Sequence, residues 1–321
     1  MPKRSKVSMP LCVFDIYEDG TAQVPSDDNL TGPGRYRWWH YDMADPALAP
    51  WLAEHLPEIP AGALLQPETR PRCDEYDDGL ILNLRGINLN EGQQADQMVS
   101  VRMWVTDAVV ITVRMRRVFA IDELRALAAE NNAPPRPSAF VEALVSRLTA
   151  RVQVEVARLA DRTAFYEADL EDHSTPPPKE LPVTRRSAIR LERYLAPQRH
   201  ALERLATLNL PLVPDVDAMK LRELANRTAI VVEELDALQE RIVTVQDEHD
   251  NQVAQRQARH SYMLSIAAAV FLPLGFLTGL FGVNVGGMPG VDDPRAFAIL
   301  CLAMVGLAAI MLAVLKWLRW L

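Results

Sequence analysis

The tripeptide Gly282-Val283-Asn284 is the part of this sequence whose chemistry points most clearly to an ion. It directly follows residues 261–281, which contain no charged side chain. An asparagine amide is uncharged, and several of them around a symmetry axis would offer a ring of carbonyl oxygens to a hydrated cation without trapping it. The tripeptide could instead simply end a helix, because glycine and asparagine often close helices in a left-handed turn.

A second polar pattern precedes the uncharged run. Asp247, Asp250, Gln257, Ser261 and Ser265 follow one another at near-helical spacing and share one face of a predicted helix. This face could lie beside a water-filled ion pathway. It could equally be the solvated side of a helix near a membrane surface, and the spacing does not decide between the two.

Histidine and cysteine supply little evidence for a metal site held by one chain. The six histidines form no H-x-x-x-H pair, the three cysteines form no C-x-x-C pair, and we expect most histidines at the surface. His249 and His260 are the two candidates for metal ligation, because they lie near the uncharged run, where a neutral imidazole could meet a transition metal or a proton. No nucleotide-binding, hydrolase or metalloprotease motif is present, so we expect no enzyme activity.

Two uncharged runs of sufficient length predict a pair of transmembrane helices. The first is 261–281 and the second is 296–315, joined by an external loop at 282–295 and followed by a basic tail at 316–321. Basic residues precede the first run and follow the second, which by the positive-inside rule places both termini in the cytoplasm. We therefore expect a multi-pass inner-membrane protein in contact with lipid, and the N-terminus does not resemble a secretory signal.

Residues 136–260 predict long helices that form a stalk below the membrane. Proline-rich breaks at 174–182 and 211–215 separate helices expected at about 137–172, at 184–208 and from 215 onward. No proline lies between Asp215 and Pro273, so the last helix should continue into the first span.

The last of these helices has the clearest periodicity in the chain. Apolar residues and one threonine alternate at steps of three and four, at Leu221, Leu224, Thr228, Val231, Leu235, Leu238, Ile242 and Val245. This a/d seam predicts packing against partner helices.

Residues 1–135 read as an α+β domain with a mixed, antiparallel-rich sheet. Strands are expected in the hairpin that turns at Asp19-Gly20, at 35–42, at 78–89, and in a hairpin that turns at Thr106-Asp107. A helix is expected from Asp45.

The charge balance excludes one class of partner and favours another. The net charge of −8 argues against nucleic acid, which needs a basic face. Residues 261–321 hold three basic and two acidic side chains, so the negative charge belongs to residues 1–260 and would concentrate cations there.

The arrangement resembles the CorA superfamily of divalent-cation transporters, and the resemblance covers nearly the whole chain. It rests on the C-terminal two-span hairpin, the Gly-x-Asn tripeptide, the long helix that feeds the first span and the N-terminal α/β domain. Members of the magnesium branch carry Gly-Met-Asn, whereas here Gly282-Val283-Asn284 is followed by Val-Gly-Gly-Met-Pro-Gly at 285–290, which resembles the zinc-transporting ZntB branch. The segment DGLILNLRGIN at 78–88 is also similar to the soluble domain of that branch.

The resemblance implies a funnel-shaped homopentamer with a central pore lined by the first span of each subunit. It places Gly282, Val283 and Asn284 at the outer mouth, and Asp247 and Asp250 towards the inner end, where they would attract cations. Counting back from Asn284 at helical spacing, we expect these residues to line the pore: Gly275, Leu272, Ala268, Ser265 and Ser261.

The function implied is transport of Zn²⁺, with cadmium, nickel or cobalt as further cargo, driven by an ion or proton gradient without ATP or any cofactor. One alternative is a magnesium or cobalt channel of the same superfamily, which the change from Met to Val283 makes less favourable. The other is a membrane-anchored coiled-coil sensor that conducts nothing. Two spans enclose no pathway alone, so transport would require the oligomer.

Overall fold

Short apolar runs in the first third of the chain form β-strands, and the segments with apolar stripes after them form long helices. The computed structural model describes residues 10–171, 180–208, 212–283, 290 and 293–318. The chain divides into two units, Met1–Gln246 and Asp247–Leu321, and the division falls within helix α6 (Asp215–Gly282).

The first unit is built on one seven-stranded sheet in the order β2-β1-β3-β7-β6-β5-β4. Its strands are β1 (Cys12–Ile16), β2 (Ala22–Gln23), β3 (Tyr36–Asp42), β4 (Arg72–Tyr76), β5 (Gly79–Gly86), β6 (Val99–Val105) and β7 (Val109–Arg114). Five neighbouring pairs are antiparallel, and β3 pairs with β7 in parallel. The predicted mixed, antiparallel-rich sheet is therefore confirmed.

Both predicted hairpins are present, and local hydrogen bonds explain their turns. Between β1 and β2, Gly20 takes a positive φ of 85°, and the Thr21 amide donates to the Asp19 carboxylate over 2.9 Å. Between β6 and β7, the Thr106 amide donates to the Val109 carbonyl over 2.8 Å.

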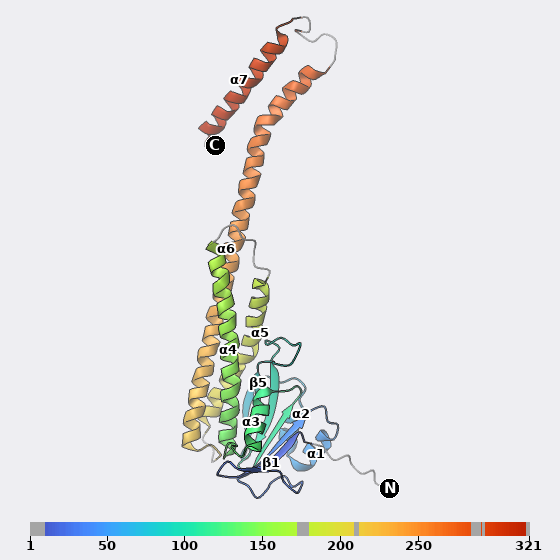
Figure 1. Ribbon diagram of the computed structural model, residues 1–321, viewed down its shortest axis with the longest axis vertical. Helices are drawn as coiled ribbons and strands as arrows, with labels where there is room; N and C mark the ends of the chain where they lie inside the picture. The colour runs from blue at the N-terminus through green and yellow to red at the C-terminus, as the bar shows by residue number, and fades with distance from the viewer. Residues whose placement is uncertain (1–9, 172–179, 209–211, 284–289, 291–292, 319–321) are drawn as a thin grey trace, which may run out of the picture. The chain divides into compact units, whose positions relative to one another are not determined.

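Two short helices, α1 (Leu48–His55) and α2 (Glu58–Leu65), cover one face of the sheet (Figure 1). Trp39 and Tyr41 of β3 stack with ring centroids 6.0 Å apart in this core and also contact Trp51 of α1. The sequence predicted α1 but not α2, whose Pro60 and Gly62 are poor helix formers.

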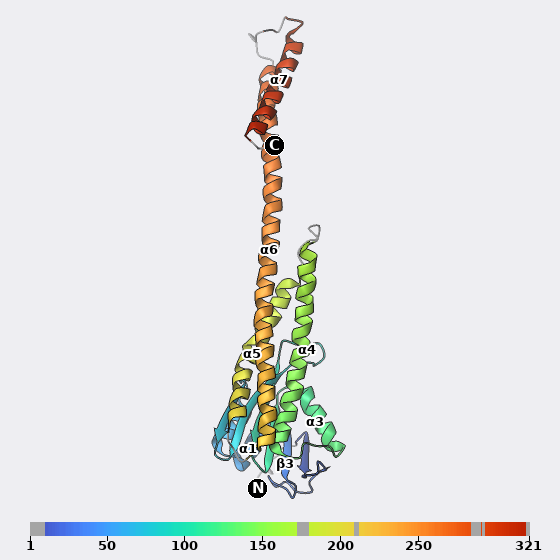
Figure 2. The same ribbon diagram turned by 90° about the vertical axis from the view of Figure 1, so that its left-hand side faces the viewer.

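The other face carries α3 (Phe119–Ala129), α4 (Pro137–Glu171), α5 (Leu181–Thr207) and the first part of α6 (Figure 2). One core joins these helices to the sheet, and a second core lies mainly among α4, α5 and α6. Helix α5 begins three residues before the expected Thr184, because Pro182 occupies the first turn, where a missing N–H costs nothing.

The predicted seam on α6 is confirmed over its whole length. All eight of its residues from Leu221 to Val245 are buried. The one polar member, Thr228, lies 3.3 Å from Thr149 of α4, hydroxyl to hydroxyl, so even this position has a hydrogen-bonding partner inside the helical core. Helix α6 is continuous for 68 residues, as the absence of proline before Pro273 predicted.

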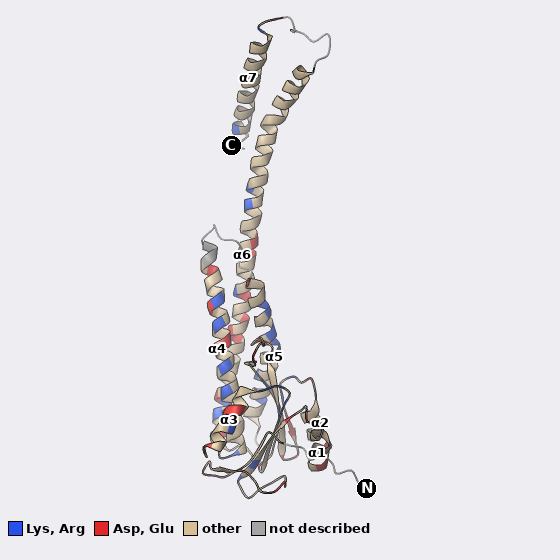
Figure 3. Ribbon diagram, turned by 45° about the vertical axis from the view of Figure 1, so that its right-hand side comes forward, with Lys and Arg blue, Asp and Glu red and all other residues tan. Residues whose placement is uncertain are grey.

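The second unit contains the rest of α6 and helix α7 (Ala296–Trp317). Both helices are long and apolar enough to cross a membrane. Figure 3 shows that their apolar stretches contain almost no charged residue, in contrast to the many charges on the helices of the first unit.

Candidate ion pathway

The apolar stretch of α6 has one partly covered face and one exposed face. The partly covered residues recur at alternating steps of three and one: Ile266, Ala269, Val270, Pro273, Leu274 and Leu277. The residues expected to line the pore are all exposed: Ser261, Ser265, Ala268, Leu272 and Gly275. At 100° per residue the two sets point about 150° apart around the helix axis. The candidate pore face is thus nearly opposite the covered face.

The same exposed face continues down α6 to two carboxylates. Asp247 and Asp250 are exposed and lie within about 40° of Ser261 around the axis. Arg256 and Arg259 fall well outside this face, by about 140° or more. In the described part of α6 from Asp247 to Gly282, the candidate face therefore carries no basic side chain.

Two hydroxyl groups of the apolar stretch, one of them on this face, are hydrogen-bonded to their own helix. Ser265 Oγ donates to the carbonyl of Ser261 over 2.9 Å, and Thr278 Oγ1 donates to the carbonyl of Gly275 over 3.0 Å. Each bond uses the only hydroxyl proton and leaves the oxygen lone pairs available to an approaching donor or cation. Such residues can therefore lie in a membrane and still present oxygen to a pathway.

Three glycines leave the outer part of α6 open on its surface. A Cβ added to Gly275, Gly279 or Gly282 would meet no heavy atom within 4 Å. Small residues of this kind allow the backbones of two helices to approach closely in a membrane. The glycines thus leave room for a second copy of the helix, although nothing within one chain requires them.

The predicted selectivity tripeptide is described only in part. Gly282 is the last residue of α6, and Val283 follows it with 52% of its surface exposed. Asn284 lies outside the described residues. The predicted role of its amide therefore stays a prediction.

The candidate metal ligands do not converge within one chain. His249 is half-buried and His260 is exposed on α6, and the described residues contain no group of three or more His, Cys, Asp or Glu side chains placed to hold a metal. Metal ligation by these histidines remains a prediction that would need other subunits.

One histidine differs from the expectation of a surface position. His40 lies on β3 with only 1% of its surface exposed, and its Nδ1 is 2.8 Å from Thr112 Oγ1. Burial lowers the pKa of His40 to about 4. The sequence at 35–42 predicts a strand but does not reveal that both faces of this central strand are covered.

A buried ion pair at the base of α6 was not predicted from the sequence. Asp217, in the first turn of α6, is fully buried and accepts hydrogen bonds from Arg136 and Ser138 at the start of α4. Its position after Pro214 signals a helix start, but only the fold brings it to residues about 80 positions earlier.

Comparison with known proteins agrees with this architecture. A family model described as "CorA-like Mg2+ transporter protein" matches residues 33–316. "Zinc transport protein ZntB" of Pectobacterium carotovorum is 37% identical over 286 residues, which are 88% of this chain and 88% of the relative. "Divalent cation transporter CmaX" of Pseudomonas aeruginosa is 35% identical over 294 residues, or 90% of this chain and 89% of the relative.

Solved structures show the same fold. The structure of full-length CmaX superposes with a TM-score of 0.86 at 32% identity and covers 99% of this chain and 100% of the other. The CorA magnesium transporter of Methanocaldococcus jannaschii has a TM-score of 0.79 at 14% identity, over 96% and 98% of the two chains, and so supports the fold alone. The matched family model and the extent of these similarities establish that the chain belongs to the CorA family.

Proposed function

We propose that this chain is one subunit of a homopentameric transporter that carries zinc across the inner membrane. The observation that carries the proposal is the face of α6 from Asp247 to Gly282, which is exposed, free of basic side chains and nearly opposite the covered face. Five such faces around an axis would line a central pathway. A single pair of spans could not enclose one.

The polarity of this face supports a cationic cargo. Carboxylates at Asp247 and Asp250 would raise the local cation concentration at the inner end, and the hydroxyls of Ser261 and Ser265 would offer oxygen further along. The lipid-facing sides of the helices need only be apolar, and Figure 3 shows almost no charged residue on α7 and on the part of α6 near its C-terminal end. We place the outer mouth at Gly282, Val283 and Asn284, with both termini in the cytoplasm.

Zinc is the preferred cargo within a wider class of divalent cations. Relatives at similar identity are named for zinc in one case and for divalent cations in another. Val283 replaces the methionine of the magnesium tripeptide, which favours a cargo other than magnesium. The gradient of the ion, or a coupled proton, would drive transport without ATP.

The direct test is metal flux into proteoliposomes that contain the purified full-length protein. A trapped indicator would report zinc and magnesium entry, each with and without an imposed proton gradient. Zinc entry faster than magnesium entry is expected, and dependence on the proton gradient would identify a coupled carrier. Preference for magnesium would assign the chain to the magnesium branch, and absence of flux from an oligomeric preparation would favour a non-conducting anchored sensor.

The variant Asn284→Ala tests the outer mouth. It removes the amide oxygen, so zinc flux should fall, or discrimination against magnesium should weaken, while the oligomer stays intact by size-exclusion chromatography. Asn251→Ala is the matched control, because Asn251 is exposed on α6 outside the candidate face. Wild-type flux and selectivity in Asn284→Ala would rule out the proposed role of this residue.

A further inference from the structure

An arginine-lined cavity in the first unit has no place in the ion pathway. Its volume is about 880 Å³, and it lies between α5, the α2–β4 connection, the β5–β6 connection and the residues that follow β7. Five arginines and two acidic residues line it: Arg70, Arg85, Arg116, Arg190, Arg193, Glu68 and Asp96. The lining thus carries an excess of positive charge within a protein whose net charge is −8.

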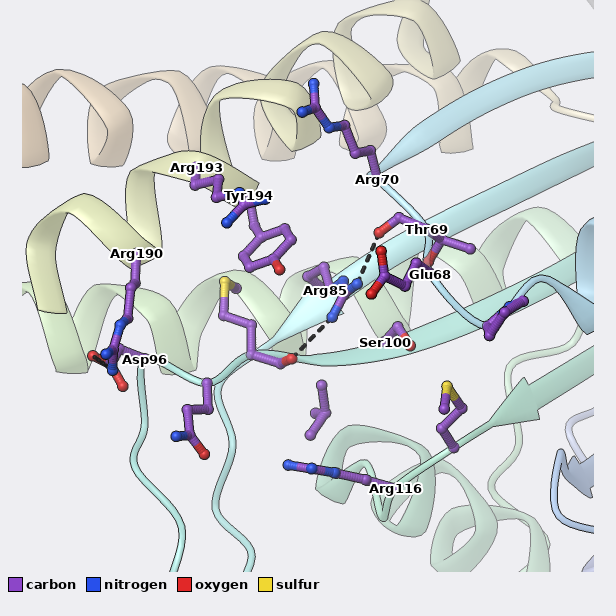
Figure 4. A pocket seen from close by; sticks show the side chains of 15 residues that line it. Glu68, Thr69, Arg70, Arg85, Asp96, Ser100, Arg116, Arg190, Arg193 and Tyr194 are labelled. Carbon is purple, nitrogen blue, oxygen red and sulfur yellow. Dashed lines mark hydrogen bonds and ion pairs between the residues drawn. The ribbon is translucent and has the colours of Figure 1, made fainter. Parts of the chain in front are cut away.

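Arg85 lies at the centre of this lining (Figure 4). Its Nη1 donates to the Met98 carbonyl over 3.0 Å, its Nη2 donates to the Thr69 carbonyl over 2.8 Å, and its guanidinium lies 4.4 Å from the centre of the Tyr194 ring. Its Nε is buried and has no hydrogen-bond partner among the described residues. A guanidinium normally satisfies all its donors when it leaves water, so this one has unused capacity.

A second guanidinium, that of Arg102 on β6, is close enough to Arg85 for the two charges to interact. Arg102 is fully buried, and it donates to the carbonyls of Gln66 and Pro67, to the Ser100 hydroxyl and to the Met115 sulfur. Neither Arg85 nor Arg102 forms an ion pair with a carboxylate among the described residues. Burial, and for Arg102 also the charge of Arg85, lowers the pKa of both groups, that of Arg102 to about 10. Glu68 is an acidic neighbour of the half-buried Arg85, whereas the charge of Arg102 is buried with no carboxylate partner among the described residues. Such burial is costly, and an anion in the cavity would offset the positive charge that remains.

Further polar atoms at the cavity also lack partners. Asp96 is 4% exposed and pairs with Arg190 through Oδ2 over 3.3 Å, but its Oδ1 has no partner among the described residues. Thr69 Oγ1 is also buried, and it too has no hydrogen-bond partner among the described residues. Of the five arginines, Asp96 forms an ion pair only with Arg190. Within the described residues, Arg70, Arg116 and Arg193 form no salt bridge. The cavity therefore combines unsatisfied buried groups with accessible guanidiniums.

We propose that this cavity binds a small anion that carries phosphate groups. Guanidinium forks bind phosphate oxygens with two parallel hydrogen bonds, and the arginines approach from several sides, with Arg193 and Tyr194 on one side of Arg85 and Arg116 on the other (Figure 4). The volume fits a molecule larger than a single ion. The ligand would join α5 to the sheet, and α5 shares its core with α6.

The test is isothermal titration of the full-length protein with pyrophosphate, in detergent, at about 0.15 M NaCl, with EDTA present to exclude metal complexes. Saturable binding at one site per subunit is expected. The double variant Arg116→Gln/Arg193→Gln should weaken binding by tenfold or more, since each lost charge-assisted hydrogen bond is worth about one order of magnitude in affinity. Both side chains are exposed in the structure, so the variant should fold.

The matched control is Arg186→Gln, which removes an exposed arginine from α5 that does not line the cavity. It should bind pyrophosphate like the wild type. Absence of saturable binding, or equal weakening by the double variant and the control, would overturn the proposal. A parallel titration with ADP distinguishes the sources: tighter binding than pyrophosphate assigns a nucleotide, and equal or weaker binding assigns the phosphate groups alone.

Discussion

Arg136 and Asp217 form a two-point ion pair that ties the start of α6 to the start of α4. The contacts are 3.0 Å from Nη2 to Oδ1 and 3.1 Å from Nε to Oδ2, and Ser138 Oγ donates to Oδ2 over 2.6 Å. The Asp217 side chain is fully buried, whereas 39% of the Arg136 side chain is exposed. The pair therefore holds the end of the helix whose other end belongs to the candidate ion pathway.

Replacing Asp217 with Ala should destabilise the protein by about 2 kcal/mol, at the low end for a broken buried pair because Arg136 is partly exposed. Burial raises the pKa of Asp217, but the hydrogen bonds from Arg136 and Ser138 outweigh it and leave the pKa lowered. The stabilisation should thus be present above the ordinary carboxyl range and lost as the pH falls below it. Urea unfolding of the full-length chain at pH 7 and at pH 3 or below measures both effects, because the stabilisation is lost only below the ordinary carboxyl pKa of 3.8.

The control for this prediction is Arg227→Ala, which removes an exposed partner 2.9 Å from Glu223 on the same helix. It should change stability by less than about 0.5 kcal/mol. Equal losses in the two variants would contradict the role given to the buried pair.

Acidification should destabilise the first unit through His40. Its pKa of about 4 lies below the ordinary 6.5, so the unfolded chain takes up the proton first. Stability should be fully present above pH 6.5 and fall by up to about 3 kcal/mol as the pH drops to 4. Trp38, whose ring centre lies 6.3 Å from that of His40, supplies a fluorescence signal for the unfolding midpoint. His40→Gln should flatten this dependence, and the exposed His200→Gln should not; an unchanged slope in His40→Gln would refute the assignment.

Two glycines should respond oppositely to alanine. A Cβ on Gly34 would lie 2.6 Å from the carbonyl oxygen of Ile16, a backbone atom that cannot rotate away, so Gly34→Ala should cost about 1–3 kcal/mol. Gly62 is in helix α2 with nothing within 4 Å, so Gly62→Ala should stabilise by about 0.5–1 kcal/mol. Thermal unfolding compares them, and a destabilised Gly62→Ala would count against this view of α2.

Cysteines substituted for two neighbouring alanines should show which side of α6 faces water. Ala268 is on the candidate pore face, and Ala267 is exposed about 100° away around the helix. In a background without Cys12, Cys73 and Cys301, Ala268→Cys should react with a charged thiosulfonate at least about tenfold faster than Ala267→Cys, because a thiol needs water to ionise. If the two cysteine variants react at equal rates in the reconstituted oligomer, the candidate pore face is no more accessible to water than the neighbouring side of the helix, which would contradict the prediction.

Local patterns were sufficient to predict the long helices and most strands. The step of three and four residues along Leu221 to Val245 and the absence of proline before Pro273 depend only on neighbouring positions, and both were confirmed. The two hairpins likewise follow from turn residues between apolar runs. Strand β4 was missed because its charged residues, Arg72, Asp74 and Glu75, suit the edge of a sheet and lack an apolar alternation.

Long-range packing decided the remaining features. The parallel pairing of β3 with β7 joins Arg37 to Val109, and no local rule specifies such a partner. The arginine-lined cavity collects residues from five separate stretches of the chain, none of which forms a motif by itself. The sequence by itself determined the long helices and the hairpins, because their residue patterns are periodic and involve only neighbouring positions. Tertiary structure decided which distant charges meet, as Arg136 and Asp217 do, and which, such as Arg102, are buried without a carboxylate partner among the described residues, because these depend on contacts between segments far apart in the chain.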